Sequence, residues 1–346
     1  MPYPNEQGAR RVHLAHTGGT IGMRRTAHGY APSPGYLAQE LERMPELRHA
    51  DMPEWELHER DPILDSSNLR PAHWLEIARD IVARADDFDG FVVLHGTDTM
   101  AYTASALAFM LRGLGKPVVL TGSQIPLCEL RSDGRENLLT AMLIAAAEPP
   151  IPEVGLFFGA RLFRGCRSVK VNASGFEAFD SPNCPPLASV GIDIEVDWNI
   201  VRAPDGAESA LPDALDATVG ALRLFPGISP ELVRNALRPP LRGLVLEAYG
   251  AGNAPDDDPA LLEAIAAATE RGVVIVDCTQ CLRGTVAPGA YATGSALLRA
   301  GVIGGFDLTA EAALTKLVYL LSTPRPPEEV RDLMQRSLCG ELTAPL

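Results

Sequence analysis

Hydrophobic residues along the chain form two kinds of segment that alternate with each other. Short continuous hydrophobic runs, bounded by glycine, proline and polar residues, predict strands at residues 12–15, 91–94, 118–120, 154–158, 244–246 and 273–276. Longer segments with helical spacing predict helices at residues 74–84, 101–112, 136–148, 259–271 and 309–322. This alternation predicts an α/β fold with a mainly parallel sheet. The strand runs do not alternate strictly between apolar and polar residues, which indicates a sheet covered on both faces.

The pattern breaks between Asp193 and Asp216, where the sequence is acidic and contains proline. We interpret residues 194–216 as a linker between a larger N-terminal domain, residues 1–193, and a smaller C-terminal domain, residues 217–346. A chain of 346 residues is long enough for two domains that each bury a core of their own.

Acidic residues outnumber basic ones by 44 to 30, which gives a formal net charge of −14. Nucleic acids and anionic membranes attract the opposite charge, so we expect neither as a partner. The N-terminal sequence has no secretory signal pattern, and the most hydrophobic segment, residues 138–147, is shorter than the roughly 20 residues that span a bilayer. We therefore expect a cytoplasmic protein.

Six cysteines are scattered along the chain, and only Cys278 and Cys281 have the CxxC spacing of metal and redox sites. No second pair completes a zinc site, and all seven histidines lie at or before His95 in the sequence. We expect two reduced, half-buried thiols after a strand, and we expect neither a metal nor another cofactor.

Three predicted strands run into loops that are rich in glycine and hydroxyl groups. These loops are residues 16–22 (HTGGTIG), 95–99 (HGTDT) and 121–126 (TGSQIP). Ligands of open α/β sheets bind outside the carboxyl ends of the strands, so we expect the three loops to line one crevice. The helix that begins after Asp98 favours a carboxylate or an oxyanion at its N-terminus. The same residue types are also ordinary helix caps and turn formers, so they predict a site without defining its reaction.

Common catalytic motifs are absent: the chain has no GxSxG, no HExxH, no Walker A sequence and no GxGxxG after its first strand. Two long segments, HTGGTIG and HGTDTMAYTA, instead resemble the signatures of the bacterial-type asparaginase and glutaminase family. The resemblance continues through TGSQIPLCELRSDGRENL, RSVKVNASGFEAFDSPN, YGAGNAP, CTQC and YATGSALLRAGVIGG, over roughly residues 12–322. Within the family, the chain is most similar to the intracellular, type I asparaginases.

The resemblance implies both a fold and an activity. The implied fold is a larger N-terminal, flavodoxin-like domain that carries the active site on a mainly parallel sheet, followed by a smaller, Rossmann-like α/β domain. The implied reaction is hydrolysis of L-asparagine to L-aspartate and ammonia through a threonine acyl-enzyme. Family members pair so that each C-terminal domain borders a neighbour's active site, which implies a homo-oligomer, either a dimer or a tetramer.

The resemblance also implies roles for single residues. Thr20 matches the nucleophile, and Tyr30 matches the tyrosine that works with it. Thr97 and Asp98 match the second threonine and the aspartate that binds the substrate ammonium group, and Lys170 matches the lysine paired with Thr97. The implied substrate-binding residues also include Asp65, Ser66 and Ser67 in the LDSSN segment, with Asn253 in YGAGNAP as a candidate contributor to a neighbour's site.

The chemistry of amide hydrolysis agrees with these residue types. A threonine hydroxyl is a weak nucleophile at neutral pH and needs a base with an oriented partner. Lys170 serves as that base only if its pKa falls from about 10.4 to roughly 7–8, or if it passes the proton through Thr97. Arginine stays protonated, and only three of the 30 basic residues are lysines. The presence of Lys170 therefore agrees with the mechanism. If the motif did not match, we would attribute the occurrence of one of the three lysines at this position to chance.

Other conspicuous residues have structural interpretations. His16 and His95 are expected to be satisfied structural histidines at strand ends, and Arg131, Asp133 and Arg135 are expected to cap the following helix and form ion pairs.

Three other functions stay open. One is a glutaminase of the same chemistry. Another is the amidohydrolase subunit of a tRNA-dependent amidotransferase, which usually carries an extra N-terminal module, whereas only about a dozen residues precede the first predicted strand here. A third is a non-catalytic amino-acid sensor, against which the intact Thr20, Thr97, Asp98 and Lys170 argue.

Overall fold

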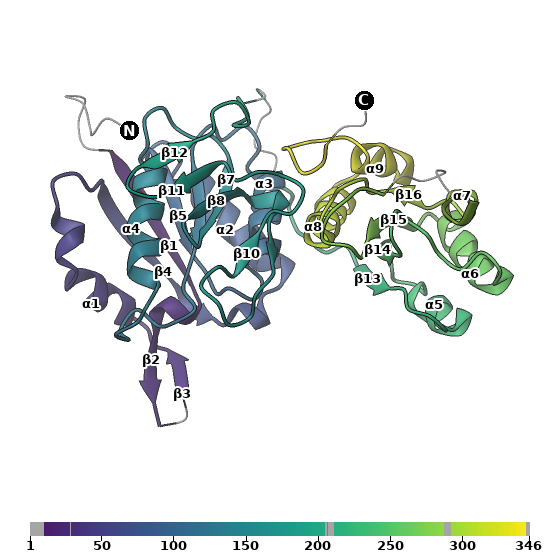
Figure 1. The fold of residues 1–346 in the computed structure, drawn as a ribbon, viewed down its shortest axis with the longest axis horizontal. Coiled ribbons are helices and arrows are strands. Elements are labelled where there is room, and N and C mark those ends of the chain that lie inside the picture. The colour runs from purple at the N-terminus through teal and green to yellow at the C-terminus, as the bar shows by residue number, and fades with distance from the viewer. Residues whose placement is uncertain (1–9, 28, 205, 207–210, 287–291, 344–346) are drawn as a thin grey trace. The chain divides into compact units, whose positions relative to one another are not determined.

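The computed structural model describes residues 10–27, 29–204, 206, 211–286 and 292–343. The chain divides into two compact units, Met1–Leu211 and Pro212–Leu346, which we call the larger and the smaller unit (Figure 1). Each unit contains a central sheet with helices on both faces. The predicted fold class, with a larger and a smaller α/β part, is confirmed.

An eight-stranded sheet forms the centre of the larger unit, in the order β12-β11-β8-β7-β6-β5-β1-β4. Strands β4, β1, β5, β6 and β7 are parallel neighbours, whereas β8, β11 and β12 extend the sheet in antiparallel fashion. The strands are β1 Arg11–Gly18, β4 Glu54–Leu64, β5 Gly90–Leu94, β6 Val118–Thr121, β7 Val154–Phe158, β8 Arg161–Arg164, β11 Ala188–Val190 and β12 Ile194–Val196.

Helices cover both faces of this sheet, with α4 on one side and α2 and α3 on the other (Figure 1). Leu41 of α1 and Leu138 of α4 pack with Val12 and Leu14 of β1 in one continuous core. Nearly every side chain of α3 is buried, because this helix lies between the sheet, α2 and the segment after β8. The four helices are α1 Tyr36–Glu42, α2 Pro71–Ala83, α3 Met100–Met110 and α4 Gly134–Ala145.

Several short elements surround the sheet. A hairpin of β2 and β3 projects from the body of the larger unit (Figure 1). The short elements are 3-10 helix η1 Thr20–Gly22, β2 Met23–Thr26, β3 Gly29–Pro32, η2 Pro45–Arg48, η3 Ser66–Asn68, η4 Gly165–Arg167, and the paired strands β9 Val169–Lys170 and β10 Phe179–Asp180.

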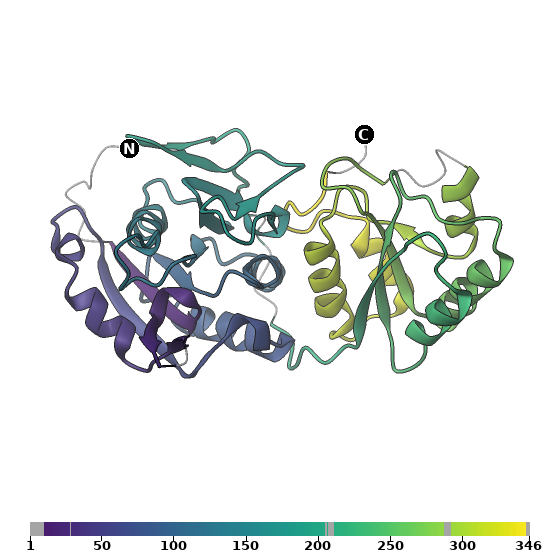
Figure 2. The same cartoon turned by 60° about the horizontal axis from the view of Figure 1, so that its bottom comes forward.

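The smaller unit contains four parallel strands in the order β13-β14-β15-β16. Side chains of α5, α6 and α7 form a core with β14 and β15, while α8 and α9 pack against the sheet as a second layer; Figure 2 shows helices on both sides of the sheet. The elements are β13 Val219–Arg223, β14 Gly243–Ala248, β15 Val274–Thr279, β16 Ile303–Gly304, α5 Pro230–Ala236, α6 Pro259–Glu270, α7 Ala292–Arg299, α8 Ala310–Leu321 and α9 Pro327–Met334.

The elements predicted from hydrophobic pattern are confirmed, since each predicted range overlaps a strand or helix of the same type. The largest element that the pattern does not predict is β4, whose sequence EWELHERDPIL carries charged residues along its length. Among the described strands, β4 pairs only with β1 and lies at the edge of the sheet, so most of its side chains stay partly exposed and no continuous hydrophobic run is needed.

The expectation of two half-buried thiols after a strand is wrong. Cys278 is fully enclosed within β15, where burial raises the pKa of its thiol, whereas Cys281 is exposed after the strand. The two environments differ because Cys278 lies within β15, in the middle of the folded unit, whereas Cys281 lies after the end of the strand. The CxxC spacing alone does not show where the strand ends.

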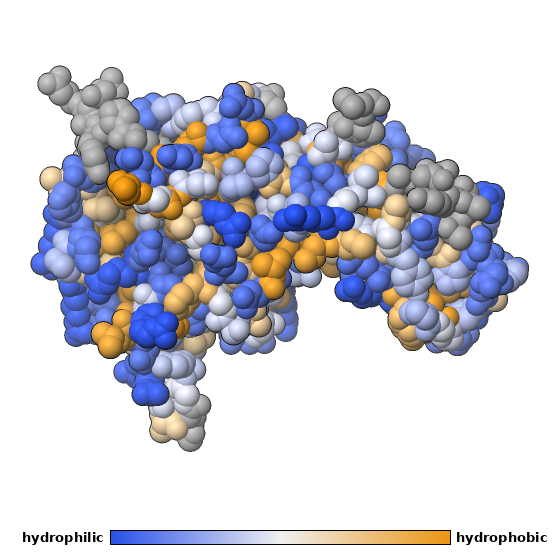
Figure 3. All heavy atoms as spheres, in the orientation of Figure 1, coloured by the Kyte–Doolittle hydropathy of each residue, from blue (hydrophilic) through white to orange (hydrophobic). Residues whose placement is uncertain are grey.

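No helix among the described residues is long and apolar enough to cross a membrane. On the face drawn in Figure 3, hydrophilic residues cover most of the larger unit and hydrophobic residues form only small, scattered patches. Scattered exposed apolar residues of this kind are normal on protein surfaces.

Candidate active site

The loops that follow four parallel strands meet at one edge of the larger sheet. Strands β4, β1, β5 and β6 are parallel neighbours in that order, so their carboxyl ends lie at the same edge. The loops after β1, β5 and β6 are the three that the sequence predicts to line one crevice, and the segment after β4 contains Asp65, Ser66 and Ser67. Small ligands of open parallel sheets bind at this edge.

Backbone segments approach so closely here that only glycine fits. A Cβ atom at Gly18, where φ is +133°, would lie 1.9 Å from the carbonyl oxygen of Leu64. A Cβ atom at Gly19, where φ is +91°, would lie 2.3 Å from the backbone nitrogen of Gly96, and one at Gly96 would lie 2.4 Å from Ser66 Oγ. The loops after β1, β4 and β5 are therefore packed against one another through glycines.

The loop after β6 joins the same group. The hydroxyl of Thr97 donates to Gln124 Oε1 at 3.2 Å, and the backbone N–H of Leu127 donates to the carbonyl oxygen of Ile21 at 3.2 Å. A side chain on Gly122 would lie 2.3 Å from the carbonyl oxygen of His95, directly after β5. The three predicted loops thus lie together, as the parallel order of their strands requires.

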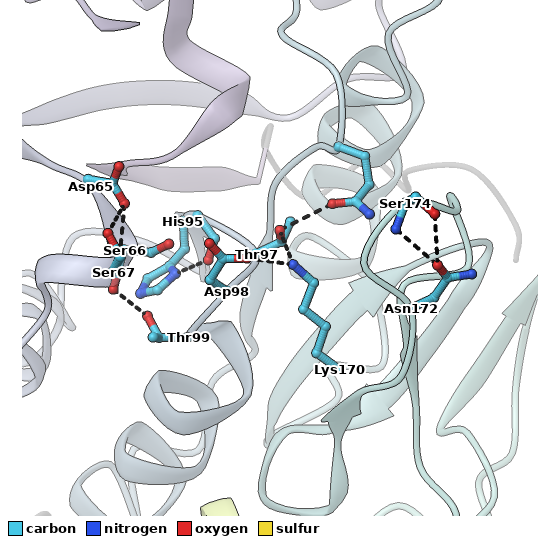
Figure 4. Close-up of polar contacts among 12 residues, drawn as sticks. Asp65, Ser66, Ser67, His95, Thr97, Asp98, Thr99, Lys170, Asn172 and Ser174 are labelled. Carbon is cyan, nitrogen blue, oxygen red and sulfur yellow. Dashed lines mark hydrogen bonds and ion pairs between the residues drawn. The ribbon is translucent and has the colours of Figure 1, made fainter. Parts of the chain in front are cut away.

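Lys170 brings a positive charge to the loop after β5, which carries Thr97 and Asp98 (Figure 4). Its Nζ donates to Thr97 Oγ1 at 2.9 Å and to Asp98 Oδ1 at 2.7 Å. The side chain of Lys170 is 20% exposed and that of Asp98 is 66% exposed, so solvent reaches this ion pair. Thr97, which Lys170 also contacts, is buried. The hydroxyl of Thr97 therefore accepts a hydrogen bond from Lys170 and donates one to Gln124, and the two bonds together fix its orientation.

Gln124 is a component of this network that sequence reasoning did not single out. Its Nε2 donates to the carbonyl oxygen of Gly175 at 3.0 Å, and its backbone N–H donates to the carboxylate of Asp133 at 3.0 Å. Asn172 holds the turn that carries Gly175, because its Oδ1 accepts the backbone N–H groups of Ser174 and Gly175 at 2.9 Å each. The only sequence signal for Gln124 was its position in the third loop.

The expected cap at Asp133 is wrong in its details. Asp133 occupies the N-cap position of α4, but its carboxylate accepts the backbone N–H groups of Gln124 and Ile125 instead of those of the helix. The expected ion pair of Arg135 is present, with Glu46 at 2.9 Å. The carboxylate of Asp133 therefore anchors the loop after β6, a contact that no spacing in the sequence indicates.

The segment after β4 forms a small self-supporting turn. Asp65 Oδ1 accepts the backbone N–H of Ser67 at 2.9 Å and its hydroxyl at 2.7 Å, which caps η3. The carbonyl oxygen of Ser66 accepts the hydroxyl of Thr99 at 2.9 Å, and Thr99 is the N-cap residue of α3 (Figure 4). These bonds tie the Asp65–Ser67 turn to the loop that carries Thr97 and leave Asp65 and Ser67 exposed.

Thr20 is the first residue of η1, directly after Gly19, and its side chain is partly buried. Tyr30 lies on β3, where its hydroxyl donates to Glu129 Oε1 at 2.8 Å and the ring is 43% exposed. The hydrogen bond to Glu129 raises the pKa of Tyr30. Within the described residues, Tyr30 therefore bonds a carboxylate of the larger unit and makes no hydrogen bond with Thr20.

Asn253 belongs to the smaller unit, where its backbone pairs with Tyr249 after β14. A contribution of Asn253 to a neighbouring subunit's substrate site stays a prediction.

His16 and His95 support the strands that lead into the site. The fully buried His95 contacts the carbonyl oxygen of Gly96 through Nδ1 at 2.7 Å and the hydroxyl of Thr103 through Nε2 at 2.8 Å. Burial lowers the pKa of His95 to about 4, and burial also lowers the pKa of His16 despite its bond to Glu59. Both shifts favour the neutral imidazole. The prediction of a satisfied structural histidine is confirmed for His95, which has a partner on each ring nitrogen. It is wrong for His16, because the buried Nε2 of His16 has no hydrogen-bond partner among the described residues.

Both units match known protein families. Residues 11–202 match the family described as Asparaginase, N-terminal, and residues 218–334 match the Glutaminase/Asparaginase C-terminal domain. The chain belongs to the asparaginase and glutaminase family. All the loops of the candidate site fall within the N-terminal family match of this asparaginase-family chain.

Relatives of this asparaginase-family chain cover nearly its whole length. L-asparaginase 1 of Escherichia coli strain K12 is 52% identical over 335 residues, which cover 96% of this chain and 98% of the relative. The crystal structure of L-asparaginase I from Vibrio cholerae has a TM-score of 0.89 at 49% identity and covers 97% of this chain and 100% of its own. The thermostable L-asparaginase from Thermococcus kodakarensis has a TM-score of 0.87 at 37% identity and covers 97% of this chain and 100% of its own.

Proposed function

We propose that this protein is an L-asparaginase, which hydrolyses L-asparagine to L-aspartate and ammonia. The observation that carries the proposal is the 52% identity with L-asparaginase 1 of Escherichia coli over nearly the full length of both chains. The contact of Lys170 with Thr97 and Asp98 agrees with it, because it joins a hydroxyl, an ammonium group and a carboxylate at the ligand-binding edge of the sheet.

In the proposed acylation step, the hydroxyl of Thr20 attacks the side-chain amide carbon of asparagine. The amide oxygen becomes an oxyanion, and backbone N–H groups of the glycine-rich loops at Gly18, Gly19 and Gly96 are candidates to stabilise it. Collapse of the tetrahedral intermediate breaks the C–N bond, and the leaving nitrogen takes up the proton lost by Thr20 and departs as ammonia. The product is an ester between Thr20 and the aspartyl group.

In the proposed deacylation step, Thr97 and Lys170 activate water. A neutral Lys170 accepts the hydroxyl proton of Thr97, which reverses the present direction of their 2.9 Å hydrogen bond, and Thr97 in turn accepts a proton from water. Hydroxide attacks the ester carbonyl, and the bond to Thr20 breaks as Thr20 takes up the proton held by Lys170, passed back through Thr97. The new carboxyl group loses its proton to water as L-aspartate leaves. Tyr30 is proposed to work with Thr20 after movement of the β2–β3 hairpin, since its hydroxyl now bonds Glu129.

Substrate recognition is proposed to use charged groups around the two main loops. Asp98 would bind the substrate ammonium group, and the Asp65–Ser67 turn, including Ser66, would hold the α-amino and α-carboxyl groups. Asp98 now bonds Lys170, so substrate would share or replace that contact.

We also propose a cytoplasmic homo-oligomer in which Asn253 of one subunit reaches the site of another. Light scattering at assay concentration is expected to show a dimer or a tetramer, and an active monomer would contradict this arrangement. Cell fractionation tests the location.

The test of the function is ammonia release from L-asparagine, D-asparagine, L-glutamine and isoaspartyl substrates. We expect a higher kcat/KM for L-asparagine than for L-glutamine, because steric rejection of one methylene is worth about 1–3 kcal/mol. Equal specificity constants would favour a glutaminase or the amidohydrolase part of an amidotransferase.

Loss of the nucleophile gives a second readout of the same proposal. Thr20→Ala is expected to abolish turnover and any covalent intermediate with every substrate. Binding without turnover in the unmodified protein would favour an amino-acid sensor.

A further inference from the structure

Two histidines and an aspartate converge in the larger unit, on residues that the proposed catalysis does not use. His13 Nε2 lies 3.0 Å from Asp80 Oδ2, and His58 Nδ1 lies 3.1 Å from Asp80 Oδ1. His13 is on β1, His58 on β4 and Asp80 on α2, so the cluster joins three elements. One ligand atom from each residue lies within 4.8 Å of the others, and this is the one such group of histidine, cysteine or carboxylate ligands in the described part of the chain.

The strand register explains why the two imidazoles meet. His58 of β4 pairs with Ala15 of β1, which makes His13 its diagonal neighbour on the same face of the sheet. The two ring centroids lie 6.0 Å apart, and α2 covers this face with Asp80 directed at both rings. The arrangement is set by backbone pairing and helix packing, so it does not depend on flexible surface side chains.

The carboxylate of this cluster is prepared to bind a cation. Its two oxygens face three side chains that can carry positive charge: His13 at Oδ2, and His58 and Arg84 at Oδ1. Arg84 also pairs with Asp80 Oδ1 and is the cation that an incoming metal ion must displace.

The two histidine rings differ in their exposure to solvent: His13 is buried and His58 is half exposed. His13 is fully buried against the rings of Phe88 and Phe91, at 5.2 and 6.0 Å between centroids, and its Nδ1 has no hydrogen-bond partner among the described residues. The imidazole proton can therefore move to Nδ1 and free the Nε2 lone pair that faces Asp80. His58 is 50% exposed, so an ion can reach the cluster from solvent past this residue.

We infer that His13, His58 and Asp80 form a binding site for one divalent transition-metal ion of the zinc type. Two imidazoles and one carboxylate are ligands that Zn²⁺ accepts at about 2.0–2.2 Å, with water in the fourth position. Ligand atoms around such an ion lie roughly 3.4 Å apart, so the 3.0 and 3.1 Å separations between Asp80 and the two histidine nitrogens must open by a few tenths of an ångström. The two histidine nitrogens, which lie within 4.8 Å of each other, must settle at the same spacing of about 3.4 Å. The ion would link β1, β4 and α2, and it would act on the stability of the larger unit without entering the hydrolytic reaction.

The test is Zn²⁺ binding to the full-length, metal-free protein in competition with a chromogenic chelator. We expect one zinc ion per chain and a rise in the unfolding temperature on zinc addition. His58→Ala removes one of the proposed ligands and is expected to weaken zinc binding by at least about 10-fold and to remove the stabilisation. The lower limit follows because loss of a residue that only orients a metal ligand already costs roughly 10–100-fold in metal affinity. Arg84→Gln is expected to tighten binding, because it removes the competing cation.

His49→Ala is the matched control, since His49 also pairs its Nδ1 with a carboxylate, Asp51 at 3.3 Å, but belongs to no such three-ligand group among the described residues. Asp80→Asn keeps the shape of the cluster and is expected to act as His58→Ala does. The inference is overturned if the protein binds no zinc, or if His58→Ala binds zinc as tightly as the unmodified protein. His58 is half exposed, so its loss tests the site even if Asp80→Asn does not fold.

Discussion

Lys170 is the residue that most clearly distinguishes the proposed mechanism from a simple binding site. Its ammonium group contacts both the hydroxyl of Thr97 and the carboxylate of Asp98, so it can either hold the two residues in place or exchange a proton with Thr97. An arginine can perform the first role but not the second, because its guanidinium group does not lose a proton in proteins.

Lys170→Arg separates these two roles. If Lys170 is the base behind Thr97, kcat for L-asparagine is expected to fall by about 10²–10⁴, the usual contribution of general acid–base catalysis. Steady-state kinetics at saturating substrate measure the change. A rate near that of the unmodified enzyme would show that Lys170 acts only through its charge.

The control is Lys116→Arg, which is expected to leave kcat unchanged. Lys116 donates to the carbonyl oxygens of Ala85 and Phe88, a contact that an arginine can also make and that involves no residue of the proposed site.

At the scale of elements, the site depends on how closely the loop after β1 approaches the loop after β5. The contact is made at Gly19, where a Cβ atom would meet both the nitrogen and the Cα atom of Gly96, at 2.3 and 2.4 Å. Neither atom belongs to a flexible side chain, so a substitution moves the backbone that carries Thr20 or the backbone that carries Thr97.

Gly19 has φ +91° and ψ 173°, a backbone region that is essentially restricted to glycine. Gly19→Ala is therefore expected to lower kcat/KM at least about 10-fold and to destabilise the fold by more than the roughly 1–3 kcal/mol that such a backbone costs a non-glycine residue. Kinetics and chemical denaturation measure the two effects. Gly115→Ala is the matched control, because Gly115 also has a positive φ, of +69°, but nothing lies within 4 Å of its Cβ position. Equal effects of the two substitutions would show that backbone strain alone is responsible.

At the scale of the whole molecule, the stability of the protein is expected to depend on pH through a buried carboxyl group. Asp277 in β15 is 3% exposed and its Oδ1 has no hydrogen-bond partner in the described part of the chain. Burial raises the pKa of Asp277 from 3.8 to about 7. At about 1.4 kcal/mol per unit, this shift corresponds to a penalty on the order of 4 kcal/mol once the group must ionise in the folded state.

The sign follows from proton binding. Between about pH 4 and pH 7 the unfolded chain has lost this proton and the folded chain has kept it, so this group lowers the free energy of unfolding as pH rises. Asp277→Asn is expected to be more stable than the unmodified protein above pH 7, with the difference vanishing toward pH 4. Thermal unfolding across this pH range measures it, with the exposed Asp257→Asn as control. A difference that does not change with pH would contradict the assignment.

Much of the fold follows from local pattern, and the exceptions have a common cause. Strands β5 and β6 lie between two layers of helices, so they must be continuously hydrophobic and are visible in the sequence. Strand β4 lies at the sheet edge with partly exposed faces, so its charged sequence shows no such run. The roles of Gln124 and Asp133 could not be predicted from the sequence, because they depend on contacts between separate segments of the chain that residue spacing does not indicate.

The amino-acid sequence by itself determined the α/β class, the three loops at the strand ends and, through two long signature segments, the family. These depend on short-range features: hydrophobic runs, glycine positions and contiguous motifs. The tertiary structure alone decided that Lys170 contacts Thr97 and Asp98, that Gln124 completes the network, and that His13 meets His58 and Asp80. These side-chain contacts are determined by strand register and helix packing, which bring together residues that lie tens of positions apart in the chain.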